Sequence, residues 1–345
     1  MKYSFCNDYS EGTHPKILEA LTQNNDSQET GYGEDRFSME AQALIRNACG
    51  RQDVDVHFVS GGTQANMIAL ASMLESYESV IAAATGHIAI HEAGAIEATG
   101  HKIHTVDCSG GKLTVEDIDP VISLHASDEH MVKTKAIFIS QPTELGTVYS
   151  KSEIQTLSSY AKEHDLYLYV DGARLPSALA SEANDVTLDD IAELTDMFYI
   201  GGTKNGALIG EAIIICNPEL QPHFRRHMKQ RGALLAKGRL FGLQFKTLFT
   251  DGLYLELARQ ANAMAQKLSE GIAGLGFRFL TDSPTNQIFP ILPDKVISIL
   301  QADYSFYVWS KVDTDHSSIR LVTSWATKQE HVEMFLADLK LLSKN

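Results

Sequence analysis

The 345-residue sequence contains little cysteine, only two tryptophans and no long apolar run. Its four cysteines, Cys6, Cys49, Cys108 and Cys216, are scattered, which is typical neither of a disulfide framework nor of paired metal ligands. We therefore expect free thiols in a reducing compartment. Because no apolar stretch is long enough for a signal peptide or a membrane span, we expect a cytoplasmic location.

Basic residues are also scarce. The chain has 29 Lys+Arg against 44 Asp+Glu, so its formal net charge is 29 − 44 = −15. Without a basic stripe, this charge disfavours nucleic acid and anionic membrane surfaces as partners. Apolar residues make up 44% of the chain, which is enough for a large core in one large α/β domain or two smaller domains.

Short apolar segments alternate with amphipathic ones over the first 250 residues. The predicted strands are residues 55–59, 79–84, 102–106, 136–140, 166–170 and 197–201. The predicted helices are residues 14–21, 38–50, 63–74, 91–99 and 152–164. This alternation predicts a mostly parallel sheet with helices on both faces.

The pattern changes near residue 251. A long helix is predicted at residues 252–275, short segments follow at 277–280, 287–291, 306–308 and 319–323, and a last helix covers 328–342. We therefore predict a large α/β domain at residues 1–250 and a smaller α+β domain at residues 251–345.

A lysine follows the buried strand 197–201, in Gly-Gly-Thr-Lys-Asn-Gly at residues 201–206. Packing poorly explains a lysine framed by glycines at the end of a buried strand, so Lys204 is a candidate functional amine. The alternative is a solvated loop lysine.

An aspartate ends the strand at residues 166–170, in Val-Asp-Gly-Ala-Arg at residues 170–174. Ligands bind at this edge of an open parallel sheet, so Asp171 is a second candidate. Asp171 could instead pair with Arg174 or cap the next helix.

A glycine turn, Ser-Gly-Gly-Thr at residues 60–63, joins a strand to a helix. The free N–H groups of the helix start and the Thr63 hydroxyl suit one phosphate, although such turns often bind nothing. Neither the dinucleotide nor the nucleoside triphosphate spacing is present. An amine, a carboxylate and a phosphate site together match the needs of pyridoxal 5′-phosphate.

The sequence resembles the threonine aldolase-like branch of the β-eliminating lyases, which are fold-type I pyridoxal-phosphate enzymes. The resemblance covers nearly the whole chain. Its motifs, in order, are residues 32–35 (Tyr-Gly-Glu-Asp), 60–66 (Ser-Gly-Gly-Thr-Gln-Ala-Asn), His87 with 92–95 (Glu-Ala-Gly-Ala), 170–174, 202–206 and 319–323 (Ile-Arg-Leu-Val-Thr).

The resemblance implies roles for the cofactor-binding residues. Lys204 would form the internal aldimine, and Asp171 would keep the pyridine nitrogen protonated. Gly62 and Thr63 would hold the phosphate, and His87 would lie against the ring.

It also implies a substrate site. Arg320 and Arg174, the latter beside the cofactor, would bind the amino acid carboxylate, with help from Ser10. His130 would accept the proton of the substrate β-hydroxyl, with His87 as the other histidine to test. Alternatively, His130 is a surface residue.

No metal is expected. His87 and His91 have i, i+4 spacing and Glu92 adjoins them, but a third ligand is not evident.

Two segments depart from the family pattern. Residues 141–146 read Gln-Pro-Thr-Glu-Leu-Gly where the family often has an asparagine-rich segment, which leaves the preferred substrate side chain open. Residues 229–237 replace a glycine-rich segment, which leaves open whether Lys229, Arg231 or Lys237 approaches the phosphate.

The resemblance implies an aldehyde-lyase that cleaves L-β-hydroxy-α-amino acids, such as threonine, allo-threonine or phenylserine, to glycine and an aldehyde. The alternatives are a β-eliminating lyase acting on another amino acid and a cofactor-free scaffold of the same fold. We expect a homo-oligomer, either a dimer or a tetramer. The N-terminal segment is expected to contribute to the site, and Tyr32 is a candidate residue for the site of the neighbouring subunit.

Overall fold

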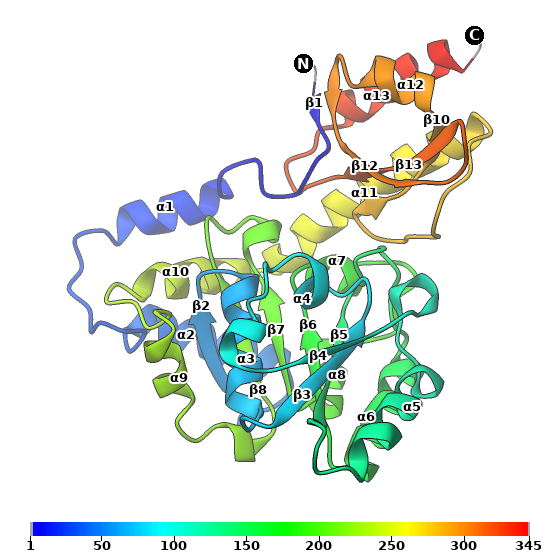
Figure 1. Cartoon of the computed structure of the whole chain (residues 1–345). Helices are drawn as coiled ribbons and strands as arrows, with labels where there is room; N and C mark the ends of the chain where they lie inside the picture. The colour runs from blue at the N-terminus through cyan, green and yellow to red at the C-terminus, as the bar shows by residue number, and fades with distance from the viewer. Residues whose placement is uncertain (1–2, 344–345) are drawn as a thin grey trace.

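The computed structural model of the chain describes residues 3–343. A seven-stranded sheet forms the centre of the larger part, and a smaller antiparallel sheet stands above it (Figure 1). In spatial order the large sheet consists of β2 (Asp55–Val59), β8 (Glu211–Ile215), β7 (Met197–Gly201), β6 (Tyr167–Asp171), β5 (Lys133–Ser140), β3 (Glu78–Ala83) and β4 (Ile103–Val106).

The large sheet is mostly parallel, as predicted. β8 is antiparallel to both of its neighbours, and the pairs from β7 through β4 are parallel. The carboxyl ends of β5, β6 and β7 therefore meet at one edge, where an open α/β sheet binds its ligands.

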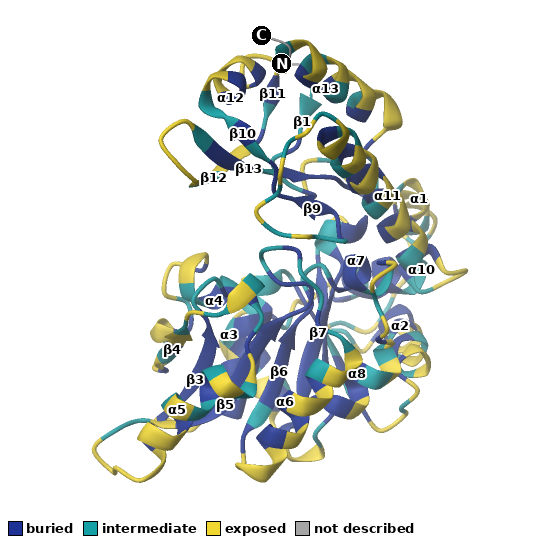
Figure 2. Cartoon of the chain, turned by 90° about the vertical axis from the view of Figure 1, so that its right-hand side faces the viewer, coloured by how far each residue is buried: buried dark blue, intermediate teal, exposed yellow. Residues whose placement is uncertain are grey.

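Helices cover both faces of this sheet. In β5, Ile137 and Ile139 belong to the core of one face, whereas Ala136 and Phe138 belong to the other. The first face is covered by α2 (Arg36–Ala48), α5 (Val115–Ala126), α6 (Lys151–Glu163), α8 (Leu188–Leu194) and α10 (Arg239–Leu248), and the second by α3 (Gly62–Met73) and α9 (Phe224–Gln230). Figure 2 shows the buried strands between helices whose outer sides are exposed.

The C-terminal part forms a smaller unit around its own core. Its sheet consists of β9 (Gln287–Ile288), β10 (Ile291–Pro293), β12 (Tyr307–Lys311) and β13 (His316–Val322). Its helices are α11 (Leu253–Gly274), α12 (Asp294–Leu300) and α13 (Gln329–Leu342). Two helices from the first part of the chain lie nearby: α7 (Leu175–Leu179) packs on α11, and α1 (Pro15–Gln23) packs on α10.

The N-terminal strand lies in this smaller unit. β1 (Tyr3–Ser4) pairs in parallel with β11 (Tyr304–Ser305), and Phe5 is buried in the C-terminal core. The division at residue 250 stays a prediction, but the first described residues pack with the second part of the chain and not with the large sheet.

The helix predicted at residues 91–99 is wrong. The chain forms α4 (His87–Ile90) and a separate 3₁₀ turn, η1 (Glu97–Thr99). Ala93 and Gly94 have φ values of 51° and 76°, in the left-handed region, so a right-handed helix cannot pass through them.

Two further features concern the cysteines and the lengths of the apolar helices. All four cysteines are free. Among residues 3–343, no helix is both long and apolar enough to cross a bilayer.

Candidate active site

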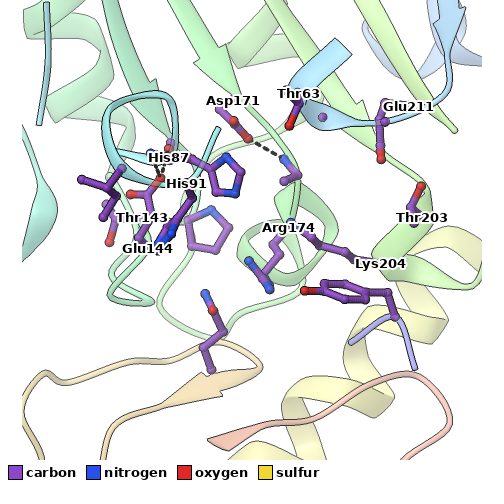
Figure 3. Close-up of a pocket in the computed structure, with 18 of the residues that line it drawn as sticks. Thr63, His87, His91, Thr143, Glu144, Asp171, Arg174, Thr203, Lys204 and Glu211 are labelled. Carbon is purple, nitrogen blue, oxygen red and sulfur yellow. Dashed lines mark hydrogen bonds between the residues drawn. The ribbon is translucent and has the colours of Figure 1, made fainter. Parts of the chain in front are cut away.

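A cavity of 920 Å³ lies at the carboxyl ends of β5, β6 and β7 and extends to β12 and β13 of the smaller sheet (Figure 3). The predicted residues among its walls are Gly62, Thr63, His87, Asp171, Arg174, Lys204 and Arg320. Residues more than 250 positions apart in the sequence thus face one space, which is large enough for a small cofactor together with a substrate.

Lys204 lies in η3 (Thr203–Asn205), directly after β7. The backbone is crowded here, because a Cβ on Gly202 would lie 2.6 Å from the Gly210 carbonyl oxygen. Burial and, next, the positive charge of Arg174 lower the pKa of the Lys204 amine below its usual value. A lowered pKa increases the fraction of neutral amine, which is the nucleophilic form.

Three donors fix the Asp171 carboxylate at the end of β6. The Tyr199 hydroxyl donates to Oδ1 at 2.6 Å, the Ala173 N–H donates to Oδ1 at 2.9 Å, and the Asn66 amide donates to Oδ2 at 3.1 Å. The alternative pairing of Asp171 with Arg174 is not found. Asp171 is therefore held in one orientation at the cavity wall (Figure 3).

The glycine turn at residues 60–63 begins α3 and faces the same cavity. Gly61 precedes the helix without a side-chain cap, so the first N–H groups of α3 are left for another acceptor. A Cβ on Gly62 would lie 2.9 Å from the Tyr199 hydroxyl oxygen, whereas Gly61 has open space around it. The turn and the Thr63 hydroxyl thus fit a phosphate group.

Arg174 already has an anionic partner. Its Nε and Nη2 donate to the two oxygens of Asp8 at 2.7 Å and 3.0 Å, and Asn286 donates to the same carboxylate at 2.9 Å. Although burial opposes ionisation of Asp8, the charges of Arg174 and Lys204 hold its pKa below the usual range. Arg174 is therefore fixed by a buried bidentate ion pair.

Arg320 is the cation better placed for a substrate carboxylate. Its guanidinium lies 5.1 Å from the Tyr307 ring and 5.2 Å from the Trp309 ring, and its buried Nε has no hydrogen-bond partner among residues 3–343. A buried donor without a partner suits an incoming anion.

His87 is connected to Asp171 by a buried chain of polar groups. Its Nδ1 lies 2.9 Å from Glu92 Oε1, and Asn66 donates to that same oxygen at 2.7 Å as well as to Asp171. Nδ1 is thus engaged, which leaves the Nε2 atom of His87 for a ligand in the cavity.

The structure does not bring the other predicted residues into this cavity. Ser10 is exposed and its hydroxyl donates to Asn7 at 2.9 Å, while its neighbour Tyr9 lines the wall. His130 is exposed in the turn before β5, at the opposite edge of the sheet, and its N–H donates to Asp128 at 2.9 Å.

The three side chains considered as cations for the phosphate are not among the described residues that line the cavity. They are Lys229, Arg231 and Lys237. Lys229 instead lies 4.9 Å from the ring of Tyr32, a residue that is 45% exposed. A contribution of Tyr32 to a neighbouring subunit stays a prediction.

Two acids of the site were missed in the sequence. Glu144 Oε1 accepts the His87 N–H at 2.9 Å and the Ser140 hydroxyl at 2.7 Å, and burial raises the pKa of Glu144. Burial also raises the pKa of Glu211 to about 7. The available signal for Glu211 was a carboxylate at the start of the apolar run Ala-Ile-Ile-Ile of β8, since charged residues are rarely buried without a reason.

Comparisons with known structures define the class of fold. A structure of Thermus thermophilus aspartate aminotransferase, 17% identical, matches with a TM-score of 0.74 over 98% of this chain and 91% of that chain. A structure of Leishmania major threonine aldolase is 49% identical, with a TM-score of 0.97 over 99% of both chains. The fold is that of fold-type I pyridoxal-phosphate enzymes.

Sequence comparisons give the family. The profile of the β-eliminating lyases matches residues 8–294. A low specificity L-threonine aldolase of Pseudomonas sp. is 33% identical over 345 residues, covering 97% of this chain and 96% of that protein. The chain belongs to the β-eliminating lyase family.

Proposed function

We propose that the chain is a pyridoxal 5′-phosphate-dependent aldehyde-lyase that cleaves L-β-hydroxy-α-amino acids to glycine and an aldehyde. The observation that carries this proposal is the presence of Lys204, Asp171 and the glycine turn in one cavity. The names of the Pseudomonas and Leishmania relatives support the threonine-like substrate class.

The residues of the cavity fit the cofactor. Lys204 provides the amine for its aldehyde, Asp171 the carboxylate for its pyridine nitrogen, and Gly62 and Thr63 the donors for its phosphate. When bound, pyridoxal phosphate supplies an electron-accepting ring that delocalises the carbanion left at Cα by bond cleavage.

The chain's own groups would bind and orient the substrate. Arg320 would offer its buried Nε, which has no hydrogen-bond partner among residues 3–343, to the carboxylate. Asp8 holds Arg174, whose charge acts on Arg320. His87 Nε2 can accept the β-hydroxyl proton within the same chain, because Glu92 fixes the other ring nitrogen.

Product analysis tests this proposal. Threonine, allo-threonine and phenylserine should give glycine and an aldehyde in equal amounts. A β-eliminating lyase would instead release pyruvate and ammonia from amino acids with a leaving group on Cβ, and it would give no glycine from any substrate. A protein with no visible absorption after addition of pyridoxal phosphate would indicate a cofactor-free scaffold.

We also propose a cytoplasmic homo-oligomer, either a dimer or a tetramer. Tyr9, Ile90 and Tyr307 lie at the cavity with exposed fractions of 52%, 52% and 49%, so a second copy could cover apolar side chains there. A light-scattering mass equal to one chain in an active sample would contradict this.

A further inference from the structure

Glu211 lies between the two loops that make the cofactor site. In the register of the large sheet, its backbone pairs with Val59 of β2 on one side and with Gly201 of β7 on the other. Val59 directly precedes the glycine turn, and Gly201 directly precedes the segment with Lys204. The Glu211 carboxyl group is therefore a wall of the cavity at the junction of both loops (Figure 3).

The carboxyl group of Glu211 is buried. Glu211 is only 5% exposed, and its Oε2 accepts the Gly202 N–H at 2.7 Å. Lys204 and Asp171 are the charged groups that act on it, from β7–η3 and β6. Two buried hydroxyls, those of Tyr199 on β7 and Tyr254 on α11, are in turn influenced by its charge.

A phosphate at the glycine turn would place a second anion in this enclosed space. Two anions that share a buried site cannot both stay ionised without a large electrostatic cost, so the weaker acid retains a proton. A phosphate monoester loses its last proton near pH 6, whereas burial raises the pKa of Glu211 to about 7 even before any anion is bound. Glu211 is then the group to be protonated, and a protonated carboxyl group can donate a hydrogen bond to an anion.

We propose that Glu211 takes up a proton when a phosphate group occupies the glycine turn, and that phosphate binding at this site is thereby coupled to pH. The inference rests on the proposed pyridoxal-phosphate site. By linkage, the neutral acid strengthens phosphate binding, and bound phosphate strengthens proton binding by the same factor.

Pyridoxine 5′-phosphate is the probe that isolates this coupling. It carries the phosphate group but has an alcohol in place of the aldehyde, so it cannot bond covalently to Lys204. We would titrate it into the 345-residue chain, freed of bound cofactor, between pH 7 and pH 8.5. In this range the phosphate remains a dianion, so the part of the pH dependence that is lost in Glu211→Gln reports the Glu211 carboxyl group.

The dissociation constant of the wild type should rise about fivefold or more over this range. In Glu211→Gln, which imitates the neutral acid, the dissociation constant should rise clearly less than in the wild type. Glu78→Gln, at a similarly buried acid (5% exposed) at the start of β3 on the opposite edge of the sheet, should retain the wild-type dependence. An equal pH dependence in Glu211→Gln would overturn the proposal and point to Lys204 or to the ring nitrogen of the probe as the titrating group.

Proton uptake on binding can be measured on the wild type alone. This measurement tests the proposal even if the Glu211→Gln variant does not fold. Calorimetry at pH 8 in two buffers of different ionisation heat should show uptake of most of one proton with pyridoxine 5′-phosphate and little with pyridoxine, which lacks the phosphate. No uptake with either would contradict the proposal. Failure of pyridoxal phosphate to give its visible absorption band would reject the proposed function instead, so the two failures are distinguishable.

Discussion

At the scale of single residues, the Asp171 carboxylate is the best-determined group of the site. Hydrogen bonds from Tyr199, Ala173 and Asn66 set its orientation, and the Asn66 contact extends this order to Glu92 and His87. The two residues that would contact the cofactor ring are thus positioned by one polar network, and a change at one end is expected to disturb the other.

Replacing Asp171 by Asn should reduce turnover by at least about 100-fold, because an amide cannot hold the proton on the pyridine nitrogen. The variant is nearly isosteric, so the fold should persist. Steady-state rates with threonine and a far-ultraviolet spectrum would check both points. A rate near that of the wild type would give Asp171 a different role.

His130→Phe separates two candidate bases. If His130 accepts the β-hydroxyl proton, as the family resemblance implies, the cleavage rate should fall by on the order of 10²-fold to 10⁴-fold, while proton exchange at Cα continues. His130 lies outside the cavity of its own chain, so this role needs a neighbouring subunit. If both the rate and the threo to erythro preference are unchanged, His87, whose Nδ1 is held by Glu92, becomes the base to test.

At the scale of elements, the ends of β6 and β7 are packed against each other with no space for a side chain. A Cβ on Gly172 would lie 1.9 Å from the Tyr199 carbonyl oxygen, and the Gly172 carbonyl oxygen itself accepts the Gly201 N–H at 2.9 Å. This contact sets the separation between the strand that carries Asp171 and the strand that leads to Lys204.

Gly172→Ala should therefore destabilise the fold by about 1–3 kcal/mol and lower activity, because the two strand ends must separate. Gly12→Ala is the matched control, since a Cβ on Gly12 would have no atom of residues 3–343 within 4 Å beyond its chain neighbours, and the variant should stay within about 0.5 kcal/mol of the wild type. Denaturant unfolding measures both variants. Equal stability of the two variants would refute the crowding argument.

Some elements were predictable from the sequence and others were not. β7 begins and ends where predicted, because its apolar residues are buried on both faces. The break after α4 depends on the left-handed conformation of Ala93, for which an alanine gives no local signal. β8 was missed, although its pairing between β2 and β7 is what places Glu211 at the site.

At the scale of the whole molecule, the cavity depends on contacts between distant segments. The strand-end positions of Lys204 and Asp171 could be predicted, because parallel strands bring their carboxyl ends to one edge. The Asp8–Arg174 ion pair joins residues 166 positions apart. The neighbouring strands β12 and β13 of the smaller sheet bring Arg320 and its aromatic rings to the cavity at the edge of the large sheet. Neither the ion pair nor the approach of the two sheets has a local pattern that would have predicted it.

The stability of the whole chain should fall in mild acid because of His104. This residue of β4 is buried with Nε2 3.1 Å from the Ser79 hydroxyl and its ring 4.2 Å from that of His125. Burial, followed by the charges of His125 and Lys102, lowers the pKa of His104 from 6.5 to about 4. The unfolded chain therefore binds a proton that the native chain does not, and stability is lost as pH falls from 6.5 towards 4.

The thermal midpoint of the wild type should accordingly fall further between pH 7.5 and pH 5 than that of His104→Gln, by about 2 °C or more. Scanning calorimetry at the two pH values measures this difference. Parallel decreases in both proteins would assign the acid sensitivity to other groups.

The most direct test of the central claim is to locate the lysine that bonds to the cofactor. Borohydride reduction of the chain with bound pyridoxal phosphate, followed by peptide mass mapping, should place the label on Lys204. Lys204→Ala should fold, take up no label and produce no glycine from threonine. A label on another lysine, or steady-state turnover by Lys204→Ala, would contradict the account.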